Sequence, residues 1–261
     1  MKYQMLGDSD CPLLHVELQN NESIKIERGA MVYVSNVEIE GKMNCSKKGL
    51  GGVLGAIGRS MTSGESVFIT HATGKSSDAY IGIAPSIPGK IKCLQVGGMT
   101  QYRLNTGAFL ACDMSVEYMM KSQNVGKAFF GGTGGFFVME TSGEGDVLVN
   151  AFGDLLMLHV TPDRPITIDN EHVVAWDASL NYDIHIASGT FGFTTGEGLV
   201  NEFHGEGDVW IQTRNLHSLA DAVSPFLPSS NNLVSIDNRE ESAMLSSFFV
   251  WKYLDVQLYF R

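Results

Sequence analysis

The sequence is poor in positive charge and in long apolar runs. Its 18 lysine and arginine residues face 29 aspartate and glutamate residues, so the formal net charge is −11. Such a chain repels nucleic-acid backbones and anionic membranes unless its few cations cluster, which disfavours nucleic acid as a partner. No uncharged apolar run reaches the roughly 18 residues of a spanning helix, and residues 1–14 lack the apolar core of a signal peptide. These absences predict a soluble, cytoplasmic protein.

Cysteine is scarce and widely spaced. The four residues of this type contain no C-x-x-C pair, which disfavours a disulfide framework and a zinc site. They are Cys11, Cys45, Cys93 and Cys112. We expect reduced thiols that are buried or incidental.

Histidine pairs of the kind that hold metals in double-stranded β-helices are missing too. The seven histidines never form an H-x-H motif. The nearest candidate is "NEFHGEGDV" (201–209), in which acidic residues alternate with His204. Its Gly-Glu-Gly-Asp core recurs at 143–146 without a histidine, so turn geometry explains it better than a metal does. We expect no metal site.

Catalytic signatures are also absent. The stretch "TGKSS" (73–77) ends like a P-loop, but Ile69 stands where the first P-loop glycine belongs, and the segment lies between two expected strands. The glycine-rich linkers contain no G-x-G-x-x-G motif, and the chain has no G-x-S-x-G nucleophile elbow. We therefore expect no cofactor and nominate no catalytic residue, which makes an enzyme the less favoured class.

What the sequence does contain is a threefold internal repeat. Each copy opens with a four-residue apolar run, a polar turn and an alternating segment, and a second shared element follows a glycine-rich linker. The opening elements are 29–40, 107–118 and 171–182, and the second elements are 64–82, 135–153 and 198–214. Gly107 and Glu171 lie 171 − 107 = 64 residues apart, and the first copy is longer, mostly within its linker at 47–66.

Alternation within each copy predicts strands. Ile24 and Ile26 alternate with charged residues, and a run of apolar residues follows each Gly-Glu-Gly-Asp-Val turn, at 143–147 and 205–209. This turn suits a tight hairpin, because glycine accepts positive φ at little cost. We expect an all-β fold of three small antiparallel sandwiches or rolled sheets, each of roughly six to eight strands, arranged around a pseudo-threefold axis.

The pattern changes after the third copy. Asn215 is a suitable cap for a short helix that Pro225 ends, and its apolar face would be formed by Leu216, Leu219, Ala220 and Val223. The final stretch, 243–260, ends in alternating apolar residues and suggests a strand added to a sheet edge or to a neighbouring subunit. We divide the chain into repeat units at 1–88, 89–153 and 154–228, the last including the short helix, and a C-terminal appendage at 229–261.

Three segments carry a resemblance to a known family. "GGVLGAIGRSMTSGESVFIT" (51–70), "GFFVMETSGEGDVLVNAFG" (135–153) and "SLADAVSPFLP" (218–228) resemble the altered-inheritance-of-mitochondria protein twenty-four type family over roughly residues 3–228. The resemblance implies three double-stranded β-helix units similar to the tryptophan RNA-binding attenuation protein. No enzymatic activity is established for the family that the chain resembles, and the family's mitochondrial member is linked to inner-membrane organisation.

The glycine-rich linkers at 47–66, 126–138 and 189–200 are the candidate functional elements. The first combines apolar residues with a basic rim, and a linker of this kind either covers the end of a barrel or forms an exposed patch that docks on a partner. The residues that would form such an interaction loop are Leu50, Val53, Leu54, Ile57, Arg59, Phe129, Phe130 and Phe136.

Two function classes follow from these patterns. The leading hypothesis is a non-enzymatic assembly or scaffold protein, a homo-oligomer that binds a protein partner or a membrane surface through the linkers. The alternative is a small-ligand-binding protein or an enzyme whose site lies inside one β-helix unit. RNA binding, which only the fold analogy suggests, is less favoured because the basic residues around 47–59 have no aromatic neighbours.

Overall fold

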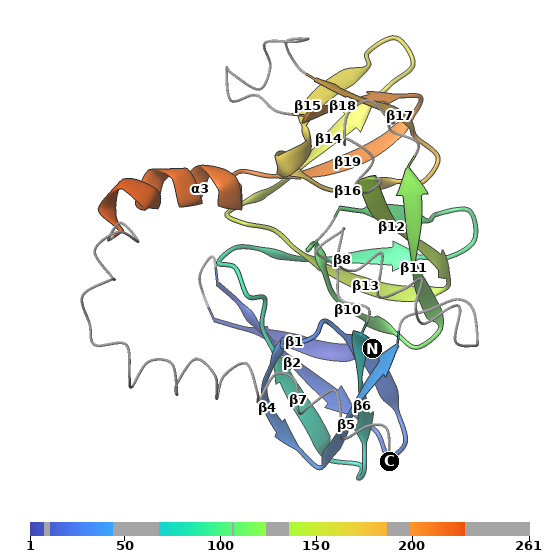
Figure 1. Ribbon diagram of the computed structural model, residues 1–261. Helices are drawn as coiled ribbons and strands as arrows, with labels where there is room; N and C mark the ends of the chain where they lie inside the picture. The colour runs from blue at the N-terminus through green and yellow to red at the C-terminus, as the bar shows by residue number, and fades with distance from the viewer. Residues whose placement is uncertain (8–10, 44–67, 106, 124–135, 187–198, 228–261) are drawn as a thin grey trace, which may run out of the picture. The chain divides into compact units, whose positions relative to one another are not determined.

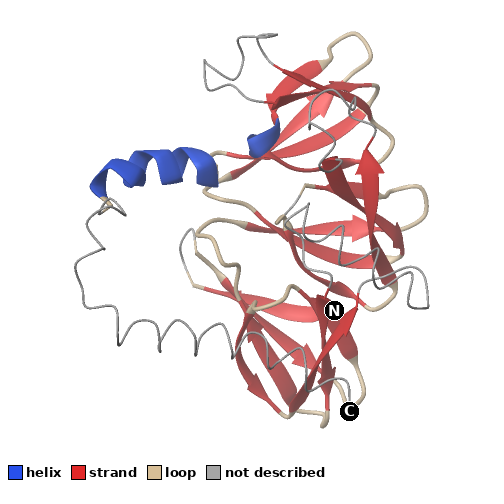
Figure 2. Cartoon of the chain, in the orientation of Figure 1, coloured by secondary structure: helices blue, strands red, loops and turns tan. Residues whose placement is uncertain are grey.

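Strands dominate the fold, as the alternating apolar pattern predicts (Figure 2). The structure is a computed structural model that describes residues 1–7, 11–43, 68–105, 107–123, 136–186 and 199–227. Within those residues, nineteen strands form four sheets in which neighbouring strands run antiparallel. The described part of the chain is all-β apart from a short helix near residue 220 and two 3-10 turns.

The first sheet, of four strands, contains the start of the chain (Figure 1). Its order is β1 (Lys2–Leu6), β2 (Leu13–Leu18), β7 (Ala79–Ile83) and β4 (Met31–Ser35). Every second residue of β2 is buried, the pattern of a strand with one face on the core.

The second sheet, of six strands, joins segments far apart in the sequence. Its order is β5 (Val37–Met43), β6 (Phe68–Gly74), β3 (Ser23–Ile26), β10 (Phe109–Asp113), β13 (Gly145–Asn150) and β8 (Ile91–Val96). The link in the middle is the β3–β10 pair, in which Cys112 lies opposite Lys25.

The third and fourth sheets contain the remaining strands. The third is ordered β11 (Val116–Gln123), β12 (Phe136–Gly143), β9 (Tyr102–Leu104), β16 (Val173–Asp177), β19 (Gly207–Gln212) and β14 (Leu155–Val160). The fourth is ordered β15 (Ile166–Asp169), β18 (Leu199–His204) and β17 (Asn181–Ile186). In the third sheet the middle link is β9–β16, with Trp176 opposite Arg103.

The Gly-Glu-Gly-Asp-Val turns are not hairpins, which corrects the sequence prediction. The first joins β12 to β13, which belong to different sheets, and the second joins β18 to β19, again in different sheets. Gly143 has φ +95°, and a Cβ there would lie 2.3 Å from the Ser115 carbonyl oxygen. Glycine is therefore needed because the chain turns a corner against another segment, a constraint that local sequence does not reveal.

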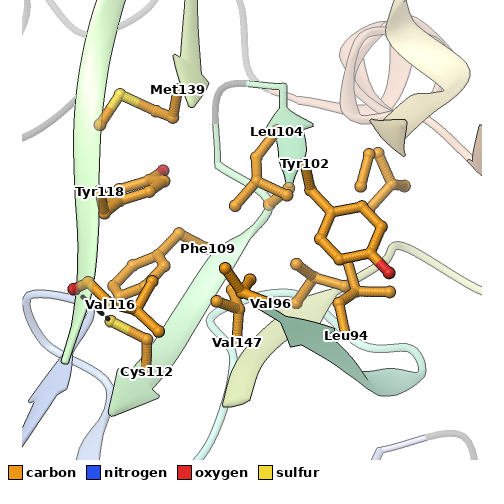
Figure 3. Packing of buried hydrophobic residues seen from close by; sticks show 14 of the residues in the cluster. Leu94, Val96, Tyr102, Leu104, Phe109, Cys112, Val116, Tyr118, Met139 and Val147 are labelled. Atoms are coloured by element: carbon orange, nitrogen blue, oxygen red, sulfur yellow. Dashed lines mark hydrogen bonds between the residues drawn. The ribbon is translucent and has the colours of Figure 1, made fainter. Parts of the chain in front are cut away.

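Among the described residues, apolar side chains from facing sheets form three clusters. In the largest, the rings of Phe109 and Tyr118 stack at 4.3 Å between centroids, next to Val147 and Met139 (Figure 3). A second cluster lies between the first and second sheets, and a third surrounds Trp176. Burial of this apolar surface is the main favourable contribution to folding.

The helix α3 (Leu216–Val223) begins as predicted, since the Ser218 amide donates to Asn215 Oδ1 at 2.7 Å. The 3-10 turn η3 (Ser224–Phe226) follows it, and another, η1 (Asn170–His172), precedes β16. The chain forms two compact units, Met1–Ser218 and Leu219–Arg261, and all four sheets belong to the first. No helix among the described residues is long and apolar enough to cross a bilayer.

Candidate interaction site

Most residues of the predicted interaction loop lie outside the described residues. These are Leu50, Val53, Leu54, Ile57, Arg59, Phe129 and Phe130. Phe136 is the first residue of β12, where its backbone pairs with Gln123. The predicted strand at 243–260 also lies outside the described part of the chain.

The structure describes the two strands that each linker connects. The first linker joins β5 to β6, the second β11 to β12 and the third β17 to β18, and each of these pairs is antiparallel. Pairing continues to the last described residue on both sides, at Met43↔Phe68, Gln123↔Phe136 and Ile186↔Leu199. Each linker is therefore the loop of a two-stranded stem.

Lys25 anchors the base of the second stem. Its Nζ donates to the Val116 carbonyl oxygen at 2.6 Å and lies 3.8 Å from Glu117 Oε1, with 9% of the side chain exposed. A buried ammonium group is costly unless it is paired and hydrogen-bonded, so these contacts stabilise the start of β11.

Arg103 makes the corresponding contacts at the third stem. Its Nε donates to Glu140 Oε2 at 3.1 Å, its Nη1 donates to the Leu180 carbonyl oxygen at 3.0 Å, and its guanidinium lies over the Tyr182 ring at 5.7 Å. Sequence reasoning assigned no role to Lys25 or Arg103. The available signal was a lone cation between two apolar residues in a short strand.

Two aspartates accept hydrogen bonds from backbone amides in the Gly-Glu-Gly-Asp-Val turns. Asp113 Oδ2 accepts from the Asp146 amide at 2.7 Å, and Asp177 Oδ2 accepts from the Asp208 amide at 2.8 Å. Burial raises the pKa of the Asp177 carboxyl, although its bond to the Asp208 amide opposes that shift. The acidic Gly-Glu-Gly-Asp-Val motifs therefore have a structural role.

The histidine motif at 201–209 makes only loose contacts. His204 Nε2 lies 3.7 Å from Glu202 Oε1 and 4.0 Å from Asp183 Oδ2. The neighbouring Asp208 bonds His159 Nδ1 at 2.7 Å instead, and this bond raises the pKa of His159. Across the described ranges, no group of three or more histidine, cysteine, aspartate or glutamate side chains could hold a metal ion.

Cys93 and Cys112 are free thiols. Cys112 is fully buried among apolar residues (Figure 3), and burial raises the pKa of its thiol to about 12. A thiol in this environment is a poor nucleophile, because the thiolate is the reactive form. Cys112 is thus a core residue.

Comparison with known proteins places this architecture in a family. The family described as mitochondrial biogenesis AIM24 matches residues 3–214, nearly the whole described chain. The chain belongs to the AIM24 family. The match ends before α3, so the segment 218–228, which contributes to the resemblance seen in the sequence, lies beyond it.

Two bacterial relatives of this AIM24 family member share most of its length. An uncharacterised protein of Streptococcus pyogenes serotype M6 is 45% identical over 234 residues, which are 89% of this chain and 93% of the relative. A Streptococcus pyogenes protein solved by X-ray crystallography is 41% identical and has a TM-score of 0.70, covering 87% of this chain and 99% of its own. The fold is thus shared with a solved bacterial relative, and the first of the two relatives is itself an uncharacterised protein.

Proposed function

We propose that this protein is a non-enzymatic assembly protein that binds a protein partner through its three glycine-rich linkers. The observation that carries the proposal is that all three linkers occupy the same position: each connects the two strands of an antiparallel pair at the end of that pair. Two of these stems are anchored at their base by a cation from another strand, Lys25 or Arg103. An apolar loop on an anchored stem suits binding.

A repeated architecture supports this proposal. We propose three double-stranded β-helix units with a pseudo-threefold relationship. With β1 set aside, the six strands of each unit, numbered 1 to 6 in chain order, would form one sheet from strands 1, 6 and 3 and another from strands 2, 5 and 4, as in β8–β13–β10 and β9–β12–β11. In all three, strand 3 shifts register against strand 6, between Met31 and Tyr33, Phe109 and Ala111, and Val173 and Ala175. The unit boundaries 88/89 and 153/154 fall in connections between strands.

The charge of the chain favours a protein partner over an anionic membrane. The net charge is −11, and the cations of the first linker are Lys47, Lys48 and Arg59. So few cations attract an anionic lipid surface weakly against that excess of negative charge. We further propose a cytoplasmic homo-oligomer, since Cys93 and Cys112 are free thiols and several of the described strands have an edge without a described neighbour.

Substitution in the first linker tests this role. We expect L54D and I57D to leave the circular dichroism spectrum and the melting temperature within a few degrees of wild type, and to weaken capture of a crosslinked protein partner at least tenfold. S60D is the matched control, because it adds the same charge to the same linker without removing an apolar side chain.

Other results would contradict the proposal. Unfolding of L54D and I57D would show that the linker covers the core. Loss of binding to vesicles of phosphatidylcholine and phosphatidylglycerol, with protein capture unchanged, would identify a membrane surface as the target.

A second candidate is a small-ligand site inside the third unit. Among the described residues, Trp176 Nε1, Tyr182 Oη and Asn201 Oδ1 are buried without a hydrogen-bond partner. They lie on β16, β17 and β18, and the centroids of the Trp176 and Tyr182 rings are 5.1 Å apart. Buried polar atoms usually have partners, so two donors and an acceptor of this kind favour a polar ligand.

A further inference from the structure

We infer that the free edge of β4 pairs with β15 of a second copy of this chain. This inference rests on the proposed repeat architecture and specifies the contact of the proposed homo-oligomer. Among the described strands, β4 pairs only with β7, and β15 pairs only with β18 (Figure 1). Each therefore has one edge free of described strands.

The chain already contains two copies of the contact that would join them. Strand 2 of the first unit, β3, pairs with strand 3 of the second, β10, and strand 2 of the second, β9, pairs with strand 3 of the third, β16. The two junctions have the same register, with Cys112 opposite Lys25 and Trp176 opposite Arg103. Two strands remain without this contact: strand 3 of the first unit, β4, and strand 2 of the third, β15.

The exposure of β4 shows what the missing neighbour would cover. Val32 and Val34 are 54% and 40% exposed. The corresponding residues, Leu110 and Cys112 in β10 and Val174 and Trp176 in β16, are all 2% exposed or less. The same strand position is buried where a second-position strand pairs with it and open where none does. An exposed apolar edge strand is a template for strand addition.

The two internal junctions predict the register of the new contact. The Glu27 amide donates to the Leu110 carbonyl oxygen at 2.8 Å, and the Asn105 amide donates to that of Val174 at 2.9 Å. By the same pattern, the Asp169 amide donates to the Val32 carbonyl oxygen of the second copy. Val34 then lies opposite Thr167, and the backbone groups of both residues face the free edges because such groups alternate along a strand.

One side chain distinguishes this contact from the internal ones. Lys25 and Arg103 each donate across their junction to a backbone carbonyl oxygen, that of Val116 or Leu180. The equivalent residue in β15 is Thr167, which is too short to reach the corresponding carbonyl of Val37. We therefore expect the contact between copies to be weaker than the internal junctions and to be reversible.

The contact uses different surfaces on the two copies. A head-to-tail arrangement of this kind closes into a ring or extends as a filament, and each copy keeps one donor edge and one acceptor edge. A defect in one edge therefore leaves the other functional.

Proline substitution at each edge tests the inference. Val34→Pro and Thr167→Pro each remove an N–H that faces a free edge and leave the existing ladder with β7 or β18 intact, a position where proline is tolerated. By sedimentation velocity at micromolar concentrations, we expect wild type to associate and each variant alone to be monomeric. An equimolar mixture of the two variants should form a heterodimer, because each contributes its intact edge. That result also requires both variants to be folded.

Lengthening the side chain at 167 should strengthen the contact. Thr167 lies opposite Glu202, as Arg103 lies opposite Glu140, so Glu202 would hold a new arginine in the same way. We expect Thr167→Arg to lower the dissociation constant of self-association about tenfold, the effect of one charged hydrogen bond. Thr167→Met, of similar length but uncharged, is the control and should have a smaller effect.

Several results would overturn the inference. These are a monomeric wild type, a mixture of the two proline variants that stays monomeric, and association that survives both variants, for example through β14, whose Leu156 and Met157 are exposed. Protection of the Val34 amide from hydrogen exchange in a monomer would also overturn it, since it would show that another segment of the same chain, such as β15, pairs with β4. These experiments do not involve the linkers, so the L54D and I57D results decide the proposed partner binding separately.

Discussion

At the residue scale, polar side chains in this fold hold backbone in place. Lys25, Arg103, Asp113 and Asp177 each bond a main-chain group of another strand or turn. A buried donor or acceptor left without a partner costs roughly 1–3 kcal/mol, so loss of such a side chain affects more than its own contacts. Strand and turn geometry therefore explains the positions of these four charged residues.

The His159–Asp208 pair gives a residue-scale prediction about pH. The bond to Asp208 raises the pKa of His159 above its usual value of 6.5. The protonated histidine therefore stabilises the fold fully below pH 6.5, and this contribution is lost as pH rises through the raised pKa. In an NMR titration, we expect the His159 pKa to fall toward 6.5 in Asp208→Asn. An unchanged pKa in that variant would contradict the assignment.

At the element scale, the fold depends on corners where the chain passes from one sheet to another. Gly74 ends β6 at such a corner, and its amide donates to the Glu22 carbonyl oxygen at 2.9 Å. A Cβ at Gly74 would lie 2.4 Å from the Gln19 carbonyl oxygen, which is backbone and cannot rotate away.

Alanine at Gly74 should therefore destabilise the protein. We expect Gly74→Ala to lower the free energy of unfolding by about 1–3 kcal/mol in urea titrations, the usual cost of overpacking. Gly41, in the neighbouring β5, is the matched control because a Cβ there has nothing within 4 Å. Gly41→Ala should leave stability unchanged or raise it by up to about 1 kcal/mol, since alanine restricts the unfolded chain. Equal effects at both sites would show that the corner at Gly74 is not tightly packed.

The same elements show how far the sequence predicts the fold. Strand positions and the Asn215-capped helix follow from local patterns, because alternation and capping involve neighbours in the chain. The hairpin prediction for the Gly-Glu-Gly-Asp-Val turns failed because Asp113, more than thirty residues away, determines what Asp146 bonds. Lys25 looks solvent-facing from its alternation with Ile24 and Ile26, and it is buried because β10 lies beside it. The linker residues of the candidate site, such as Leu54, are outside the described residues, so their role stays a prediction.

At the scale of the whole molecule, one type of strand contact is used repeatedly. The β3–β10 and β9–β16 pairs join consecutive parts of the chain. The proposed β4–β15 contact would use the same register between copies. Such an assembly would multiply the number of linkers available to a partner, which raises the overall binding strength if several linkers engage at once.

Native mass spectrometry of the full-length protein, purified without harsh washing, tests the central claim of a non-catalytic assembly most directly. We expect a species at a multiple of 28.4 kDa, alone or with a second protein, and no small molecule retained through buffer exchange. A monomer that carries an additional small mass, released on unfolding, would contradict it and favour the ligand site around Trp176, Tyr182 and Asn201.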